Sequence, residues 1–447
     1  MRQLNNLTVS LEEIDDLTGV AARALGVTRG DVAGAVLLRR SIDARGRRPR
    51  WVLSLGVTLR GDAPAERDIP RSSPPEVRRR DVRVVIVGTG PAGLFAALRC
   101  ADAGIGCTIL DRGGALRDRH RRSRRLRAHG ELDPETNLCF GEGGAGTYSD
   151  GKLYTRKSDP RVREVYGRLV EFGATSDILV DAHPHVGTNE LIPVLDMLHA
   201  HLEARGVRFH FDTRVDDLVI ESGRCVAVRA TPLGGVTGSL EFPCDSLILA
   251  TGHSARDTYA MLSERGVAMR AKPFAVGARV EHPQALVDAA QFGAFAGHEK
   301  LGSAEYFLRC QLGDRGVYSF CMCPGGFIIP TPTEVGHLNV NGMSNASRGN
   351  GLANAALVVT VNPEDAAPGG NALEGLEWQR GIERLAFLAG GGEYGAPATR
   401  LTDFARGRAS TTLPGRTSYR PSLRATNVAD VLPGFVTTAI RAALGQF

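Results

Sequence analysis

The sequence predicts an α/β fold, in which a parallel sheet is interrupted by an inserted, mostly antiparallel β domain and preceded by a small α/β module. Two observations favour this architecture. An almost unbroken apolar, β-branched run at Val82–Val87 leads into a glycine-rich turn and an apolar helix, as a parallel strand buried on both faces would. From Arg265 to about Arg416, by contrast, short strand-like runs separated by turn residues predominate.

Residues 1–61 predict the small module as a βαββ unit. Its expected elements are a short strand, a helix and two alternating strands, at Leu7–Leu11, Leu11–Leu25, Val32–Ile42 and Trp51–Leu59. The module carries no chemical motif, so docking and oligomerisation are equally good interpretations of it. Residues 62–80, with four prolines in Asp62–Glu76 and many charges, predict a linker.

The segment Asp81–Arg112 carries the strongest chemical signal. The buried strand ends in Gly88-Thr89-Gly90-Pro91-Ala92-Gly93, a helix is expected over Pro91–Ala103, and a second strand at Cys107–Leu110 runs into Asp111. In such a unit the first glycine allows a tight turn, the second lets a pyrophosphate approach the backbone, and the third lets helix and strand pack closely. The helix N-terminus attracts the phosphates. The segment therefore predicts a dinucleotide site, with a structural turn as the alternative.

Two further features narrow the choice of dinucleotide. Asp111 stands at the spacing that places a carboxylate on the adenosine ribose, which favours FAD or NAD over NADP. A second glycine-rich segment, Gly141–Gly146, has four glycines in six residues and predicts a loop that wraps closely round a ligand. NAD alone would not need this second loop, so FAD is the expected cofactor, and a glycine-rich surface loop is the alternative.

Apolar spacing predicts the remaining elements. Helices are expected at Arg161–Glu171, from Thr188 to about Ala204, at Ala372–Ala389 and near Val431–Leu444, the last with an apolar face for packing at Leu432, Phe435, Val436, Ala439 and Ile440. Strands of the first domain are expected at Val207–Phe211, Val215–Ile220, Cys225–Ala230, Ser239–Phe242 and Ser246–Ala250. The last of these ends in Ala250-Thr251-Gly252, a turn that indicates close backbone approach to the cofactor. Strands of the inserted domain are expected at Ala275–Glu281, Tyr306–Gln311, Val317–Cys323, Gly326–Pro330 and Leu338–Gly342.

The composition is that of an ordinary globular protein. Lys and Arg outnumber Asp and Glu by 54 to 49, which gives a formal net charge of +5. The arginine-rich runs at Arg39–Arg50, Arg78–Arg80 and Arg117–Arg127 are interpreted as solvated surface, with contact to an anionic ligand as an alternative. No aromatic residues interleave with them, which argues against nucleic-acid binding. No apolar run reaches the roughly 18 residues that a membrane span needs, and the start is not a signal peptide. The eight scattered cysteines are expected to be reduced thiols in a cytoplasmic protein.

Together these residues resemble a family of FAD-dependent dehydrogenases or oxidoreductases of largely uncharacterised substrate, related to glutathione-reductase-like two-dinucleotide-fold flavoproteins. The similar segments extend over nearly the whole chain and include VVIVGTGPAGLFAAL, NLCFGEGGAGTYSDGKLYTR, HPHVGTNEL, LILATGHSARDTY and FAVGARVEHPQ. The resemblance implies a Rossmann-like FAD-binding domain of the glutathione-reductase type (GR2) over 81–264, a substrate domain over 265–416, and a return to the first domain over 417–447.

The same resemblance, with the motifs above, assigns the cofactor-binding residues. The expected FAD contacts are Gly88, Gly90, Pro91, Ala92, Gly93, Asp111, Arg112, Gly143, Gly144, Ala145, Gly146, Ser149, Val215, Ala250, Thr251 and Gly252. The function that follows is an FAD-dependent oxidoreductase that moves hydride or electrons to or from an unknown small organic substrate, with NADH or NADPH as a candidate transient reductant.

The candidate catalytic residues are Lys152, His253, Arg279 and His282. Lys152 is one of only four lysines in an arginine-rich chain. We interpret it as a compact positive charge placed near the flavin, and the alternative is a surface salt bridge. Arg279 and His282 could bind an anionic substrate or move a proton, although a lone histidine is more often structural. Cys321 and Cys323 are expected to point the same way from one strand, as packing residues or a redox pair. No metal site is expected.

Similar proteins continue past Phe447 with a glycine-rich segment, a strand and a helix that complete the FAD domain. The expectation is therefore that the FAD domain of this chain is incomplete. Two alternatives to an active enzyme follow. The protein is a flavin-binding but catalytically degenerate scaffold, or a second polypeptide completes the site. A homo-oligomer is also left open by the sequence.

Overall fold

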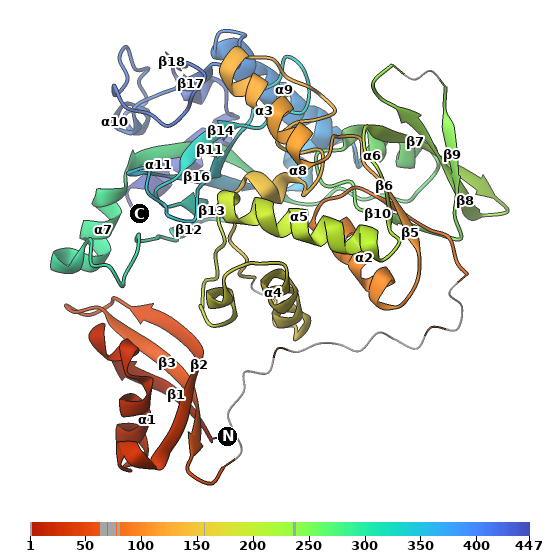
Figure 1. Cartoon of the computed structure of the whole chain (residues 1–447). Helices are drawn as coiled ribbons and strands as arrows, with labels where there is room; N and C mark the ends of the chain where they lie inside the picture. The colour runs from red at the N-terminus through yellow and green to blue at the C-terminus, as the bar shows by residue number, and fades with distance from the viewer. Residues whose placement is uncertain (1, 63–68, 70–76, 78–80, 156, 236–237) are drawn as a thin grey trace.

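The computed structural model describes residues 2–62, 69, 77, 81–155, 157–235 and 238–447 (Figure 1). The mixed α/β class with a Rossmann-like domain and an antiparallel domain is confirmed. The linker expected over 62–80 falls almost entirely outside the described residues. Among the helices of the described ranges, none is both long and apolar enough to cross a membrane.

The parallel sheet has the strand order β10-β4-β5-β6. Its strands are Ser246–Leu249, Val84–Val87, Cys107–Leu110 and Arg208–His210, and neighbouring strands pair in parallel. Alternate residues of β4 serve two cores. Val84 and Ile86 pack in the core that also holds residues of helices α2 and α5, whereas Val85 and Val87 pack against the β7–β9 meander. Burial on both faces explains why β4 reads as a continuous apolar run.

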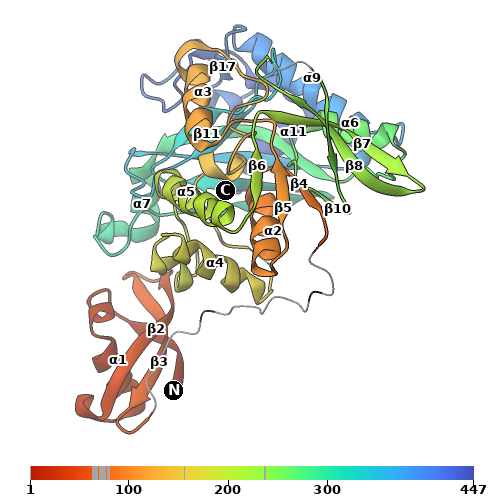
Figure 2. The same cartoon turned by 45° about the vertical axis from the view of Figure 1, so that its right-hand side comes forward.

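Two helices and an antiparallel meander enclose this sheet (Figure 2). Helix α2 spans Pro91–Asp102 and helix α5 spans Thr188–Ala204. The meander on the other face consists of β7 at Thr213–Glu221, β8 at Arg224–Pro232 and β9 at Leu240–Pro243. The predicted helix at 161–171 is confirmed as α4, Arg161–Glu171. Two helices flank the cofactor motifs, α3 at Leu116–His129 and α6 at Arg256–Glu264.

The second sheet is fully antiparallel, in the order β11-β16-β13-β12. Its strands are Phe274–Pro283, Leu352–Val361, Arg315–Cys323 and Arg309–Leu312. The sequence expectations omitted β16, although it pairs with both β11 and β13. A short hairpin of β14, Phe327–Pro330, with β15, Val340–Met343, lies beside it, and helix α9 spans Glu374–Ala389. Smaller elements complete the domain: α7 at Gln284–Phe292, α8 at Pro363–Ala366, α10 at Leu401–Ala405, β17 at Ala396–Ala398 and β18 at Leu423–Ala425.

The last helix, α11 at Gly434–Leu444, does not pack where the sequence analysis placed it. Its buried residues Val436, Ile440 and Ala443 join a core with Leu357 and Val359 of β16. The expected return to the first domain over 417–447 is therefore wrong for this helix, which covers the second sheet. The apolar face of α11 was recognised correctly, but spacing along one helix does not say which sheet it covers.

The cysteine pair of β13 also differs from expectation. The pairing of β13 with β16 shifts register between Phe320 and Cys323, which marks a bulge. Cys321 has a φ of 44° and is exposed, whereas Cys323 is buried. The two thiols therefore do not occupy equivalent positions on one face, because the bulge breaks the two-residue alternation on which that expectation rested.

The N-terminal module lies at one end of the molecule, next to α4 in both views (Figures 1 and 2). It contains β1 at Arg2–Val9, α1 at Leu17–Leu25, β2 at Val32–Asp43 and β3 at Arg50–Leu59, in the sheet order β1-β3-β2. The backbone N–H of Arg40 donates to the Val180 carbonyl at 2.8 Å, and the Ala182 N–H donates to the Arg40 carbonyl at 3.0 Å. The core of the module continues into Val287, Phe292 and Leu301 of the second domain.

Candidate functional site

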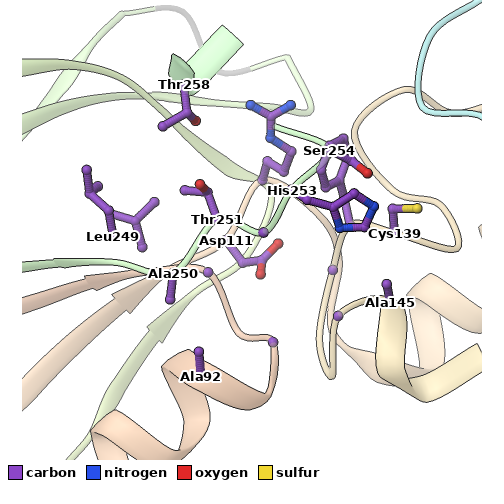
Figure 3. Close-up of a pocket in the computed structure, with 18 of the residues that line it drawn as sticks. Ala92, Asp111, Cys139, Ala145, Leu249, Ala250, Thr251, His253, Ser254 and Thr258 are labelled. Atoms are coloured by element: carbon purple, nitrogen blue, oxygen red, sulfur yellow. The ribbon is translucent and has the colours of Figure 1, made fainter. Parts of the chain in front are cut away.

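A cavity of about 510 Å³ opens where β4, β5 and β10 end, and Val87, Leu110 and Leu249 line it (Figure 3). Open α/β sheets bind their ligands at this edge. Most of the residues expected to bind the cofactor line the cavity as well: Gly88, Gly90, Pro91, Ala92, Asp111, Arg112, Gly144, Ala145, Gly146, Val215, Ala250, Thr251 and Gly252. Segments far apart in the sequence therefore meet at one site.

Three expected contacts lie behind the cavity wall. A Cβ on Gly93 would stand 1.9 Å from the Gly88 carbonyl oxygen, so this glycine permits close helix–strand packing. Gly143 has a φ of 83°, and its N–H donates to the Thr89 carbonyl at 2.9 Å. The Ser149 hydroxyl donates to the Gly146 carbonyl at 2.7 Å. These residues shape the two loops that line the cavity.

Asp111 lines the cavity, but its carboxylate already has donors within the chain. One oxygen accepts from the Thr89 N–H at 2.7 Å and from the Thr89 hydroxyl at 2.5 Å, and the other accepts from the Gly113 N–H at 2.8 Å. Asp111 is 6% exposed. The structure thus gives Asp111 a role that the motif did not predict, because its carboxylate fixes the turn between β4 and α2.

A fully buried arginine supports the second glycine loop. Arg119 of α3 is 0% exposed, its Nε donates to the Asn137 carbonyl at 3.0 Å and one terminal nitrogen donates to the Glu142 carbonyl at 2.5 Å. Its guanidinium also lies 4.9 Å from the ring centre of Tyr148. Burial lowers the pKa of Arg119. The interpretation of this arginine-rich run as solvated surface is wrong at Arg119.

Glu142 connects this loop to two helices. One carboxylate oxygen accepts from the Leu116 N–H at 2.8 Å, at the start of α3, which lacks a side-chain cap of its own. The other oxygen lies 2.5 Å from Nδ1 of His199 on α5. This hydrogen bond raises the pKa of His199. Helical spacing offered a signal for the buried side of α3, because Leu116, Arg119, Ser123 and Leu126 recur every three or four residues and are all buried.

Sequence reasoning also missed part of the lining. The overlooked residues are Cys139, Phe140, Ser254, Thr258, Tyr259 and Leu262. The first two directly precede the second glycine loop, and the others follow the Ala250-Thr251-Gly252 turn, so proximity in sequence was the available signal. The Arg112 guanidinium lies 4.6 Å from the ring centre of Phe140 and forms an ion pair with Asp257.

The four candidate catalytic residues do not come together. His253 lines the cavity. Lys152 does not: its amine donates to the Met322 carbonyl at 2.5 Å and lies 3.2 Å from a Glu305 carboxylate oxygen, at the wall of a second, larger cavity. Lys152 thus forms a partly buried ion pair, and it does not line the smaller cavity.

Arg279 and His282 both belong to β11. Nε of Arg279 donates to the Asn354 side-chain oxygen at 2.8 Å, and Nη2 donates to the Cys321 carbonyl at 2.8 Å. Nε2 of His282 lies 2.9 Å from the Tyr306 hydroxyl. Neither side chain lines the smaller cavity. Among the side chains that the structure describes, no cluster of three or more His, Cys, Asp or Glu could hold a metal ion.

Family models match three parts of the chain: an FAD binding domain at residues 81–253, an FAD-dependent protein C-terminal domain-like region at 273–447, and a domain of unknown function at 1–58. An uncharacterised protein of Clostridium beijerinckii is 36% identical over 466 aligned residues, which cover 100% of this chain and 85% of the relative. The chain belongs to a family of FAD-dependent oxidoreductases. FAD is the cofactor of the family.

Solved flavoenzyme structures resemble this FAD-dependent oxidoreductase only distantly. THI4 of Thermovibrio ammonificans is 16% identical, with a TM-score of 0.28, over 42% of this chain and 64% of that protein. A 3-ketosteroid dehydrogenase of Rhodococcus jostii has 16% identity and a TM-score of 0.30, over 57% and 69% of the two chains. The myxobacterial chondrochloren halogenase CndH has the same two values, over 68% and 57%. Similarity at this level says nothing about the substrate.

The smaller cavity fits the phosphate-bearing part of FAD. Gly90 has a φ of −70°, a conformation open to any residue, and a Cβ there would meet only the Gly144 Cα, at 3.7 Å. A Cβ on Gly252 would have nothing within 4 Å. Packing within the chain therefore does not require the missing side chain at Gly90, whereas a pyrophosphate against the backbone does. Gly90 also precedes the first turn of α2, whose N–H groups point outward to such a group.

Proposed function

We propose that this FAD-dependent oxidoreductase is of the dehydrogenase type and moves hydride or electrons between its flavin and a small organic substrate. The open backbone surface at Gly90, which lies against Gly144 in the wall of the smaller cavity, supports the cofactor part of the proposal, because it leaves room for a dinucleotide where a side chain would otherwise fit. Flavin supplies the redox chemistry when it is bound.

The residues of the chain have separate roles in this proposal. The N-terminus of α2 and the loop at Gly144–Gly146 bind the phosphates, and Arg119 with Glu142 keeps that loop in place from behind. His253 is the candidate proton carrier on the cofactor side, since it alone of the four candidates lines the smaller cavity. Lys152 faces the larger cavity and is the candidate for contact with substrate.

Anaerobic titration of the purified holoprotein tests the redox assignment. Bleaching of the flavin band on addition of NADH or NADPH, and its return with an electron acceptor, is the expected result. Flavin that is bound stoichiometrically but is reduced by neither nicotinamide nor by photoreduction would contradict the oxidoreductase. That outcome would favour a flavin-binding scaffold instead.

Gly90→Val tests the cofactor site with little effect on packing. The new side chain projects into the cavity, so the flavin dissociation constant should rise at least about tenfold, a loss of about 1.4 kcal/mol in binding, and the ratio of flavin to protein absorbance after gel filtration should fall. Gly106→Val is the matched control, because Gly106 belongs to the same domain, is exposed and has nothing within 4 Å of an added Cβ. Both variants should keep the far-UV circular dichroism of the parent. A Gly90→Val protein that retains its flavin would exclude this cavity as the site.

A further inference from the structure

The larger cavity has walls from several separate parts of the chain, among them the segment 300–307. Its volume is about 1560 Å³, and none of its lining residues lines the smaller cavity. Arg39 and Trp51 come from the N-terminal module, Lys152 and Tyr154 come from the segment after the second glycine loop, and residues of β12 and β13 form another wall. The N-terminal module, which the sequence left without a chemical role, is therefore part of a ligand-sized space.

Aromatic side chains are concentrated on these walls. Tyr154, Phe307 and Phe320 line the cavity while 42%, 52% and 56% exposed, respectively. Large apolar side chains left this open on one concave surface indicate a binding site rather than a surface adapted to water alone. Trp51, Tyr306 and Tyr318 line the same space. A ligand with a planar, apolar body would cover this surface.

The charged side chains of the lining are mostly cationic. Six are Lys or Arg (Arg39, Arg40, Lys152, Lys300, Arg309 and Arg348), and two are acids (Asp181 and Glu305). Four of the cations already have carboxylate partners: Arg40 with Asp181, Lys152 and Arg348 with Glu305, and Lys300 with Asp15.

Arg39 and Arg309 are different. Both are exposed, and neither forms an ion pair with any residue in the described part of the chain. The indole N–H of Trp51 likewise has no hydrogen-bond partner there, although this side chain is only 8% exposed. An anionic group in the cavity would find two guanidinium groups, from different parts of the chain, that no carboxylate of the described residues neutralises.

The second glycine loop connects this space to the cofactor site. Gly146 lines the smaller cavity, and Lys152, six residues later, lines the larger one. Between them the Ser149 carbonyl accepts from the Thr188 hydroxyl at 2.8 Å, which fixes the path of the loop. One short, well-bonded segment thus forms a wall of each cavity.

We propose that the larger cavity is the substrate site, that the substrate is an organic anion with a planar, apolar body, and that the N-terminal module supplies Arg39 and Trp51 to it. This inference rests on the proposed oxidoreductase function and adds the substrate class to it. The cavity also gives the module a function other than docking or oligomerisation.

Two fluorescent probes with the same rings test the anion requirement. 8-Anilino-1-naphthalenesulfonate carries a sulfonate, and N-phenyl-1-naphthylamine lacks it. The chain has two tryptophans, so Trp378→Phe leaves Trp51 as the reporter in the holoprotein. We expect the sulfonate to quench Trp51 saturably and to bind more tightly than the neutral probe. Probe fluorescence in the unmodified holoprotein gives the same affinities if Trp378→Phe is unstable.

Substitutions of the two cavity arginines test where the sulfonate probe binds. Arg39→Gln and Arg309→Gln should each weaken sulfonate binding by about fivefold and leave the neutral probe unaffected. Arg384→Gln is the control, because Arg384 is an exposed arginine of α9 that does not line the cavity. Equal affinity for both probes, or no change in the Arg39 and Arg309 variants, would overturn the anion site.

The visible absorption band of the bound flavin tests separately whether the larger cavity is the substrate site. Saturating sulfonate should shift the visible spectrum of the bound flavin, because the two sites share the loop. An unchanged flavin spectrum at full occupancy would overturn the assignment as substrate site. Neither result depends on whether nicotinamides reduce the flavin, so failure here is distinguishable from failure of the proposed function.

Discussion

His185 is a partly buried histidine whose Nε2 atom is shielded from solvent. It pairs with Lys152 in an isolated two-residue bridge, and its Nε2 has no hydrogen-bond partner among the described residues. Burial first, and the charge of Arg348 second, lower the pKa of His185 to about 4. The folded protein therefore holds this imidazole neutral at a pH where an unfolded chain would protonate it.

Stability should consequently fall in weak acid. The unfolded histidine titrates near about 6.5, so protonation favours the unfolded chain increasingly as the pH drops from there towards the folded value. Between pH 7 and pH 5 the parent should lose about 1–2 kcal/mol through this group. His185→Gln should lose that much less, as measured by urea unfolding at both pH values. His183→Gln, an exposed neighbour, should behave like the parent. Identical slopes for all three proteins would contradict the assignment.

At the scale of single residues, the sequence predicted the roles that depend only on local backbone geometry. Gly88, Gly90 and Gly93 have the positions that the motif assigns to them, because a tight turn, an open approach and close packing each follow from the missing Cβ. Asp111 differs, because donors within its own βαβ unit, Thr89 and Gly113, occupy its carboxylate. Arg119 differs too: charge does not distinguish it from its exposed neighbours, and only the helical spacing of the buried residues of α3 does.

Among the elements, α3 and α5 are joined through Glu142. The hydrogen bond between Nδ1 of His199 and the Glu142 carboxylate is the leading cause of the raised pKa of His199, so the protonated imidazole is favoured in the folded protein. A raised folded pKa contributes stability that is fully present below the unfolded value and is lost as the pH rises through the folded value.

Glu142→Gln should therefore destabilise the protein by about 1–3 kcal/mol, and more at pH 6 than at pH 8. The control is a substitution of Glu203, the second carboxylate beside the same histidine. Glu203 lies 3.4 Å from Nε2 of His199, and its side chain is 60% exposed. Glu203→Gln should cost less than about 0.5 kcal/mol. Thermal unfolding at both pH values measures the difference. A Glu203 variant as unstable as the Glu142 variant would show that burial of Glu142 is not what matters.

Elements with clear end signals were predictable, and those without were not. Helices α4 and α5 begin and end where the sequence placed them, since apolar spacing and flanking residues agree. β16 was missed because most of its residues are buried on both faces, so the two-residue alternation is absent. The bulge at Cys321 was missed for a related reason, as register depends on the partner strand.

At the scale of the whole molecule, Arg40 contributes to the contact between the N-terminal module and the rest of the chain. Its Nε lies 2.5 Å from an Asp181 oxygen, a terminal nitrogen lies 3.0 Å from Asp177, and its guanidinium stands 5.8 Å from the ring centre of Trp51. The side chain is 24% exposed. Arg40→Met removes the charge but keeps much of the apolar stem.

This variant should lower the free energy of unfolding by about 1–2 kcal/mol and alter the Trp51 emission. Arg45→Met is the control, because Arg45 is 91% exposed and its one ion-pair partner among the described residues is nearby Asp43. Chemical unfolding followed at the tryptophan and by circular dichroism gives both quantities. An Arg40→Met protein with unchanged stability and emission would mean that the backbone bridge and the shared apolar core hold the module alone.

The arrangement of whole domains lay largely beyond the sequence. Apolar spacing identified α11 as amphipathic, yet only the assembled structure shows that its apolar face meets β16. The larger cavity could not be predicted for a similar reason, since its walls come from several separate segments that share no motif. The smaller cavity was predictable because each of its main contributors carries a local motif: the βαβ unit, the second glycine loop and the Ala250-Thr251-Gly252 turn.

The loop from Gly141 to Lys152 is bonded to the first domain through the Gly143 N–H and to the second through the Lys152 amine. A cofactor that binds only the folded chain stabilises it by mass action. Cofactor loading and domain docking are therefore coupled equilibria, each of which strengthens the other. A substitution far away, on the outer side of the second sheet, can thus leave the protein colourless without touching the flavin. Conversely, excess FAD should rescue such variants, but not those whose side chains fill the cavity itself.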